Sequence, residues 1–197
     1  MTKSDLSNKR ILLLGAETEL GRAIASALAA AGAHLAVVAA STEPEAAFAV
    51  QRLARRLSAP ERPVIAQAID ATNEMAVRVM VKQASRQIEG LDALVFAADL
   101  DDATEDAFFL SLRWAGAEMF RRSGGSAIWV DASLAPNESK TGGVILPSPG
   151  LPASAKGSGN VTAHLVAGAG RPLAETAAEV GDIIDREASV AGAPDTG

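Results

Sequence analysis

The hydrophobic positions of this chain fall into two alternating patterns. Short continuous apolar runs, typical of strands buried on both faces of a parallel sheet, recur with room for a helix between them. Six runs are expected to be strands: residues 11–14, 35–39, 64–69, 93–97, 127–130 and 161–167. This β-α alternation with short connections predicts an α/β fold, a doubly wound parallel sheet with helices on both faces.

Helical patterns lie between these runs. The segment 22–31 is rich in alanine and leucine and ends at Gly32, and the Thr42-Glu43-Pro44-Glu45 stretch matches a capping box that opens a helix to residue 57. Apolar residues three and four positions apart predict further helices around residues 77–88, 108–119 and 173–184. Trp114 and Trp129 are expected to fill the core. Residues 1–197 are therefore expected to form one domain.

One segment interrupts the alternation. Residues 134–160 contain four prolines, five glycines and four serines and show no helical period. We expect an irregular segment there, in place of the helix that would follow the fifth strand. Residues 189–197 are small and polar and are expected to form a disordered tail.

Composition excludes several classes of function. The chain carries 18 basic and 24 acidic residues, a net charge of −6, which disfavours nucleic acid and anionic membranes as partners. It contains no cysteine and only two histidines without a ligand spacing, so no metal site is expected. No apolar run approaches the length of a membrane span, and the first ten residues lack a secretory segment. The expected location is cytoplasmic.

A glycine-containing loop follows the first predicted strand. Gly15 and Gly21 enclose it, and a predicted helix begins directly afterwards. A loop in this place brings backbone N–H groups and a helix N-terminus to a diphosphate. Two interpretations remain open: the glycines serve a cofactor, or they form a tight strand-to-helix turn that folding alone requires.

These features resemble the short-chain dehydrogenase/reductase family over residues 10–185. That family's loop reads T-G-x-x-x-G-x-G, and Gly15 and Gly21 match its first and last glycines. Asp70 matches the family's adenine-contacting aspartate, and Ser133 matches its catalytic serine. The resemblance implies a Rossmann fold with NAD or NADP as cofactor, and it implies these contact residues: Gly15, Thr18, Glu19, Leu20, Gly21, Asp70 and Ala97.

The loop departs from the family where phosphate would bind. Glu19 replaces the middle glycine and Glu17 stands two residues earlier. Their carboxylates would repel a diphosphate, and a side chain blocks the close backbone approach that glycine permits. Ala40 and Ser41 stand where the family carries an acid for NAD or an arginine for NADP, so the sequence indicates neither nucleotide.

The catalytic set departs further. The family uses a tyrosine as proton donor in the motif Y-x-x-x-K, but this chain contains no tyrosine. Pro152 stands in the tyrosine's place, four residues before Lys156. Ser133 and Lys156 are thus the only family-like catalytic candidates, and Ser133 is also interpretable as an ordinary serine at a strand end.

Two functions follow as hypotheses. The first is a non-catalytic family relative that acts as a binding, regulatory or assembly subunit, with at most weak dinucleotide binding. The alternative is an NAD(P)-dependent oxidoreductase with a non-standard catalytic site. In the family, the helix missing here packs against a second subunit, which would leave Phe108, Phe109, Leu112 and Trp114 beside an open apolar patch. The expected state is a homo-oligomer, or a hetero-oligomer with an intact short-chain dehydrogenase.

Overall fold

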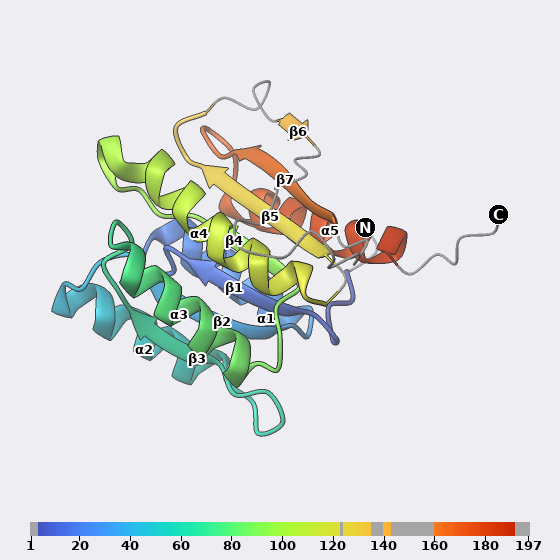
Figure 1. Ribbon diagram of the computed structural model, residues 1–197, viewed down its shortest axis with the longest axis horizontal. Coiled ribbons are helices and arrows are strands. Elements are labelled where there is room, and N and C mark those ends of the chain that lie inside the picture. Colours follow the sequence, from blue (N-terminus) through green and yellow to red (C-terminus); the bar gives the residue numbers. More distant parts are fainter. Residues whose placement is uncertain (1–3, 123, 135–139, 143–159, 192–197) are drawn as a thin grey trace.

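A computed structural model describes residues 4–122, 124–134, 140–142 and 160–191 and confirms the expected parallel sheet (Figure 1). Its strands run in the spatial order β3-β2-β1-β4-β5-β7-β6. The connections change direction between β1 and β4, as in doubly wound folds. The six parallel strands are β1 (Arg10–Leu14), β2 (His34–Ala39), β3 (Ile65–Ala68), β4 (Ala93–Phe96), β5 (Gly124–Asp131) and β7 (Asn160–Ala167).

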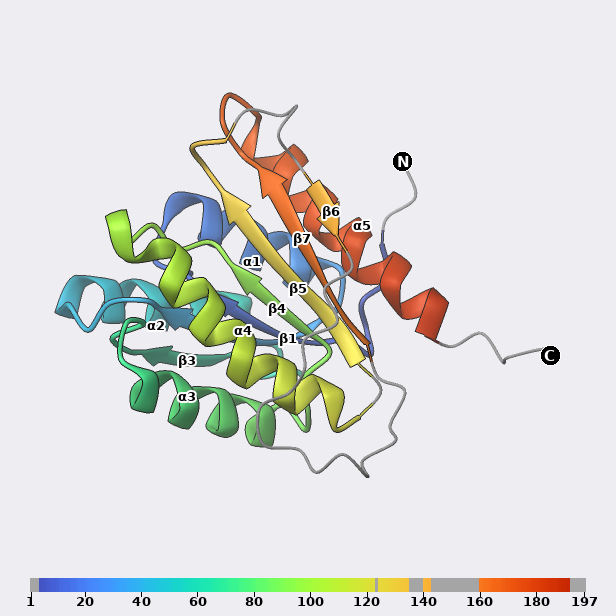
Figure 2. The same ribbon diagram turned by 45° about the horizontal axis from the view of Figure 1, so that its top comes forward.

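Helices cover both faces of the sheet. One face carries α1, α2 and α5, and the other carries α3 and α4, which lie side by side (Figures 1 and 2). A short 3-10 helix, η1 (Asp101–Ala103), precedes α4. The bounds are α1 (Glu19–Ala30), α2 (Pro44–Leu57), α3 (Glu74–Gln87), α4 (Thr104–Phe120) and α5 (Leu173–Ala191).

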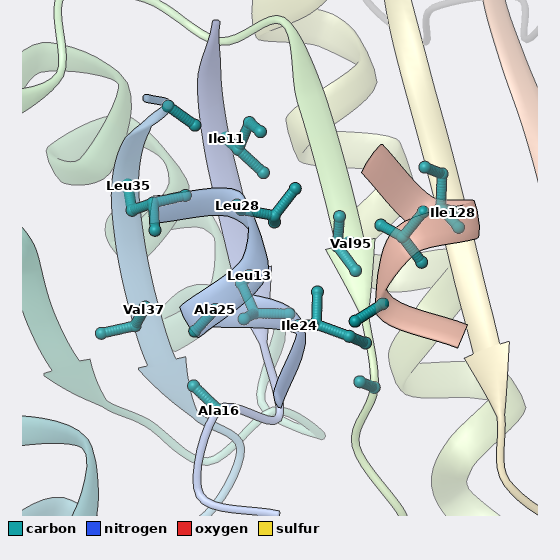
Figure 3. Packing of buried hydrophobic residues seen from close by; sticks show 14 of the residues in the cluster. Ile11, Leu13, Ala16, Ile24, Ala25, Leu28, Leu35, Val37, Val95 and Ile128 are labelled. Carbon is teal, nitrogen blue, oxygen red and sulfur yellow. The ribbon is translucent and has the colours of Figure 1, made fainter. Parts of the chain in front are cut away.

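The core consists of two layers because successive side chains of a strand point to opposite faces. Ile11 and Leu13 of β1 pack towards α1, and Figure 3 shows Ile24 of α1 among them. Leu12 and Leu14 join the layer beneath α3 and α4. The four β1 side chains from Ile11 to Leu14 are fully buried, which explains why this strand reads as a continuous apolar run.

Part of the irregular segment proves to be a strand. β6 (Lys140–Gly142) pairs antiparallel with β7 at the edge of the sheet, so the prediction of irregular structure was wrong for these three residues. The rest of the interval between Leu134 and β7, including Lys156, lies outside the described residues. The predicted loss of the helix after β5 falls on that undescribed part.

Two predicted helix ends also differ from the structure. The capping-box prediction was wrong: α2 is capped by Glu43 without a side-chain hydrogen bond, because Pro44 occupies the first helical position and shifts the cap past Thr42. At the other end of the chain, α5 continues to Ala191, three residues into the expected tail.

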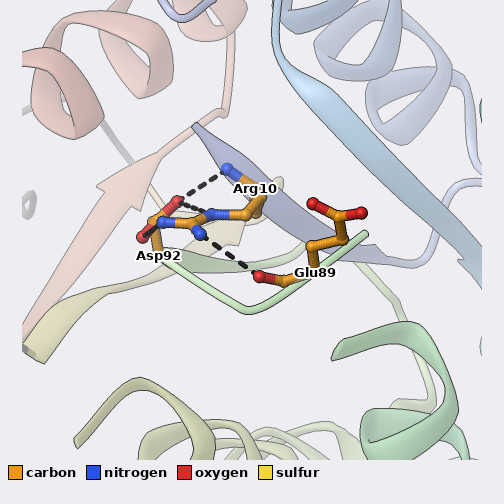
Figure 4. Close-up of polar contacts among 3 residues, drawn as sticks. All are labelled: Arg10, Glu89 and Asp92. Carbon is orange, nitrogen blue, oxygen red and sulfur yellow. Dashed lines mark hydrogen bonds and ion pairs between the residues drawn. The ribbon is translucent and has the colours of Figure 1, made fainter. Parts of the chain in front are cut away.

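An ion pair joins the starts of the two central strands (Figure 4). Arg10 Nε donates to Asp92 Oδ2 at 2.6 Å and Arg10 Nη2 donates to Asp92 Oδ1 at 2.7 Å. The Arg10 backbone N–H donates to the same carboxylate at 2.9 Å, and Nη1 donates to the Glu89 carbonyl at 3.2 Å. This paired geometry belongs to the strong class of charged hydrogen bonds and fixes β1 against the chain entering β4.

We expect Asp92→Asn to lower the free energy of unfolding by roughly 1–3 kcal/mol, because it leaves the Arg10 guanidinium without its paired acceptor. Glu74→Gln is the matched control, since it breaks an exposed pair with Arg113 and should cost less than about 1 kcal/mol. Chemical denaturation measures both. Equal losses for the two variants would contradict the structural role of the Arg10–Asp92 pair.

Candidate functional site

A cavity of about 600 Å³ lies at the carboxyl ends of β1, β4 and β5. This is the switch point of the sheet, where the chains leaving neighbouring strands turn to opposite faces and open a crevice. The start of α1, the segment after β4 and the end of β5 supply most of its wall, and Leu173 of α5 completes it. A doubly wound sheet binds ligands at this place.

The two loop glycines are required by backbone packing. Gly15 has φ +89°, and a Cβ there would lie 2.3 Å from the Ala98 nitrogen. A Cβ on Gly21 would lie 2.0 Å from the Gly15 carbonyl oxygen. Any larger residue would push the loop away from β4 or α1 away from the loop. The tight-turn interpretation therefore accounts for both glycines without a ligand.

Thr18 ties the loop to its surroundings. Its hydroxyl accepts a hydrogen bond from the Gly21 N–H at 2.9 Å and so caps α1. The same hydroxyl lies within donating distance of the Gly15 carbonyl at 2.9 Å and the Ala97 carbonyl at 3.2 Å. The positive end of the α1 dipole is thereby held at the wall of the cavity.

Glu19 occupies the loop position that a diphosphate uses. In dinucleotide-binding loops the middle glycine lets the backbone approach the pyrophosphate, whereas the outer two serve the turn and the helix packing. Glu19 is exposed and lines the cavity. The chain thus retains the glycines that folding needs and lacks the one that a bound dinucleotide needs.

The wall of the cavity is acidic. Among the described residues that line it, none is a lysine or an arginine. A diphosphate brought into this cavity would meet carboxylates in place of cations. The site therefore lies where a doubly wound sheet binds a dinucleotide, but its charge does not fit the diphosphate. The acidic residues of the wall are Glu19, Asp99, Asp101, Asp102, Glu105 and Asp131.

Glu17 places another carboxylate at the end of β2. Its Oε1 accepts a hydrogen bond from the Ala40 N–H at 2.9 Å. Its Oε2 is buried and has no hydrogen-bond partner among the described residues. Burial raises the pKa of the Glu17 carboxyl, while the N–H groups of Glu17 and Ala40 and the charge of Arg22 oppose this rise.

Ser133 is held by a neighbouring acid. Its hydroxyl donates to Asp131 Oδ1 at 2.6 Å, and its backbone N–H donates to the same oxygen at 2.8 Å. A serine that polarises a carbonyl must donate its proton to that carbonyl. In this chain the Ser133 hydroxyl donates its hydrogen bond to Asp131, so the serine is not positioned as a free donor.

The structure brings together most of the predicted site residues. The cavity is lined by Thr18, Glu19, Leu20, Ala97 and Ser133, and the two glycines enclose the loop that contributes the first three of these residues.

Asp70 lies outside the cavity lining. It follows β3, beyond β2, and its carboxylate accepts from the N–H and hydroxyl of Thr72 at 3.0 and 2.6 Å. The hydrogen bond from the Thr72 hydroxyl lowers the pKa of the Asp70 carboxyl most, and the hydrogen bond from the Thr72 N–H lowers it further.

Trp129 was assigned wholly to the core, but it also lines the cavity. One side of its ring stacks on Phe108, with centroids 5.1 Å apart, and Phe108 belongs to the core layer beneath α4. The sequence signal for this position, partly in the core and partly in the cavity wall, was that Trp129 lies two residues before the end of β5.

Among the described residues no group of acids and histidines could hold a metal ion. Within the same residues, no helix has the length and hydropathy of a membrane span.

Comparison with known proteins gives a consistent match. The family model described as short chain dehydrogenase matches residues 9–147. A short-chain type dehydrogenase/reductase from Mycobacterium marinum is 29% identical with a TM-score of 0.54, over 65% of this chain and 57% of that chain. A short chain dehydrogenase from Burkholderia cenocepacia J2315, solved in complex with NADP, is 28% identical with a TM-score of 0.54 over the same shares.

A curated relative matches over a shorter stretch. Glycine betaine reductase ATRR from Emericella nidulans is 34% identical over 96 residues, which is 49% of this chain and 7% of that protein. The chain also spans little more than half the length of the solved structures that it matches.

The buried Glu17 carboxylate predicts a pH-dependent stability difference. Its folded pKa is raised above the ordinary 4.5, so the folded chain retains a proton that the unfolded chain releases. The free energy of unfolding of the unmodified protein therefore falls as pH rises from about 4.5 through the folded pKa. Glu17→Gln carries no such proton and should gain stability relative to the unmodified protein over that interval, then level off. Urea denaturation across pH measures this, and a pH-independent difference would contradict the burial of the charge.

Proposed function

Because this chain belongs to the short-chain dehydrogenase family, we propose that it is a non-catalytic member that acts as a binding, regulatory or assembly subunit, with at most weak dinucleotide binding. The family binds NAD or NADP and carries out oxidoreductase chemistry. In this chain the family's proton-donating tyrosine is missing, so we expect the nucleotide-binding fold to remain without the oxidoreductase chemistry.

The absence of tyrosine carries the proposal. The family's proton donor stands between the strands that correspond to β5 and β7, an interval that this sequence contains in full. The 197 residues include no tyrosine, so no phenol is available there. Loss of a positioned general acid typically costs a factor of about 10²–10⁴ in rate.

The contacts of Ser133 support the same conclusion. Reduction of a carbonyl group builds negative charge on its oxygen, and a site stabilises that charge with hydrogen-bond donors. The Ser133 hydroxyl donates to Asp131 instead, and the Asp131 carboxylate itself lines the cavity. A developing oxyanion would therefore meet a negative charge where the family supplies a donor.

Exposed apolar side chains on α3 and α4 support a role in assembly. Met75 and Val79 of α3 are 61% and 45% exposed, and Phe109 of α4 is 52% exposed. The two helices lie side by side on one face of the sheet (Figure 2). Exposed apolar groups on two neighbouring helices favour a protein partner if they form one patch. The partner that we propose is a family subunit, either a second copy of this chain or an intact short-chain dehydrogenase.

The direct test of the non-catalytic role is a turnover assay. We expect no oxidation of NADH or NADPH above background with aldehyde and ketone substrates, because the chain contains no tyrosine to donate the proton. An intact family member assayed in parallel is the control, and nicotinamide absorbance is the readout. Turnover that co-purifies with the protein and falls in Ser133→Ala would contradict the proposal and favour an enzyme with a non-standard site.

The assembly role is tested by light scattering. We expect the purified protein, alone or co-expressed with an intact family member, to elute above the mass of one chain. Phe109→Asp should reduce it to a single chain, because a charge replaces an apolar contact. Phe48→Asp is the control, since Phe48 is 60% exposed on α2 and covers the other face. A single-chain mass for the unmodified protein under both conditions would overturn this part of the proposal.

A further inference from the structure

The surface formed by α3 and α4 concentrates positive charge in an acidic protein. The chain carries a net charge of −6, yet it contains no acidic residue between Met75 and Ile88. From Ala107 to Arg121 it contains one acid, Glu118. The two helices lie side by side (Figures 1 and 2), so their cations are presented together. We call this the basic surface, and its cations are Arg78, Lys82, Arg86, Arg113 and Arg121.

Direct contacts join the two helices at this surface. Arg78 of α3 lies over the ring of Trp114 of α4, with its Cζ 5.0 Å from the ring centroid. Arg113 Cζ lies 5.4 Å from the same centroid, and Arg113 Nη1 donates to Glu74 Oε1 of α3 at 3.2 Å. Two guanidinium groups of like charge thus share one indole ring, which attracts both of them.

The three cations of α3 have no acidic partner. Arg78, Lys82 and Arg86 form no ion pair with any described residue. They stand four positions apart, so they lie along one side of α3, and like charges at this spacing destabilise a helix. Arg78 and Lys82 are also half-buried, which takes part of each charge out of water. Folding alone gives no reason for this row of cations, whereas an anionic partner would offset their repulsion.

Exposed apolar side chains border the cations. Met75 and Val79 stand one turn apart on α3 and are 61% and 45% exposed. Phe109, one turn before Arg113 on α4, is 52% exposed. A nucleic acid would match the cations but not these apolar groups, and the net charge of −6 would repel it. The combination fits a protein segment in which carboxylates alternate with apolar side chains.

We propose that the basic surface docks an acidic segment of a partner protein. The carboxylates of that segment pair with Lys82 and Arg86, and its apolar side chains cover the exposed apolar groups of α3. The inference rests on the binding or assembly role of the proposed function, and it names the chemistry of the partner. Charge complementarity of this kind gives specificity and speeds association.

Two peptides test the requirement for acids. The first is a fluorescein-labelled amphipathic helix of glutamate and leucine, and the second has glutamine in place of glutamate. Fluorescence anisotropy measures their binding to the full chain. We expect the glutamate peptide to bind at least about tenfold more tightly than the glutamine peptide. Its affinity should fall at least about fivefold between about 50 and 500 mM salt, because salt screens the charges.

Two pairs of substitutions test the surface. Lys82→Glu combined with Arg86→Glu should weaken binding of the glutamate peptide at least about tenfold. Arg55→Glu combined with Arg56→Glu is the matched control, because it makes the same change in net charge at exposed positions of α2, on the other face of the sheet. The control should change the affinity less than about twofold.

A milder variant guards against a loss of structure. Lys82→Gln combined with Arg86→Gln removes the two charges without adding repulsion, so it should weaken binding by an intermediate factor. Circular dichroism verifies the fold of each variant.

Three results in the peptide assay would overturn the inference. The glutamate peptide could fail to bind at millimolar concentration, or the α2 control could lose as much affinity as the Lys82 and Arg86 variant. A single-stranded oligonucleotide could also bind as tightly as the peptide and depend on the same two residues, which would make the surface a general polyanion site.

Light scattering separates this inference from the proposed function. If the unmodified protein self-associates and Lys82→Glu with Arg86→Glu dissolves that assembly, the surface belongs to a second copy of this chain and the inference is wrong. A single-chain mass for the unmodified protein, together with tight binding of the glutamate peptide, would reject assembly with a family subunit and retain the acidic partner.

Discussion

The site depends on the close contact between the loop after β1 and the end of β4. A glycine with positive φ is needed at Gly15 because its Cβ would lie 2.3 Å from the Ala98 nitrogen, and Thr18 bridges the same loop to Ala97. This contact directs Glu17 towards β2 and places Glu19 at the start of α1, facing the cavity. Loop geometry of this kind is required for folding, so its presence alone does not indicate that a phosphate is bound.

The structure keeps the glycine loop and helix start typical of a nucleotide site, but surrounds them with negative charge. The outer two glycines of the loop and the cap of α1 are present, as the packing of β1, α1 and β4 requires. Carboxylates stand at the positions that anionic ligand groups would approach, and Asp131 accepts the hydrogen bond of the Ser133 hydroxyl. A reversed charge weakens phosphate binding and oxyanion stabilisation together, and this supports the proposed non-catalytic role.

The sequence predicted the sheet because buried parallel strands leave a continuous apolar signal, as β1 and β2 do. It could not predict the Glu17–Ala40 contact, since the two residues are 23 positions apart and only the register of β1 with β2 brings them together. The Ser133–Asp131 hydrogen bond could not be predicted either, because it depends on the conformation of the turn after β5, which the identity of these two residues does not determine. β6 escaped prediction because three polar and small residues become a strand only by pairing with β7.

The central claim is that the glycine loop carries a buried carboxylate, that of Glu17, which accepts a hydrogen bond from the Ala40 N–H. The amide proton resonance of Ala40 tests it directly, because a hydrogen bond to a titrating carboxylate shifts that resonance as the group ionises. We expect the Ala40 resonance of the unmodified protein to titrate with an apparent pKa above the ordinary 4.5 of a glutamate, and to be insensitive to pH in Glu17→Gln. A resonance that does not move in the unmodified protein, or that moves equally in the variant, would contradict the claim.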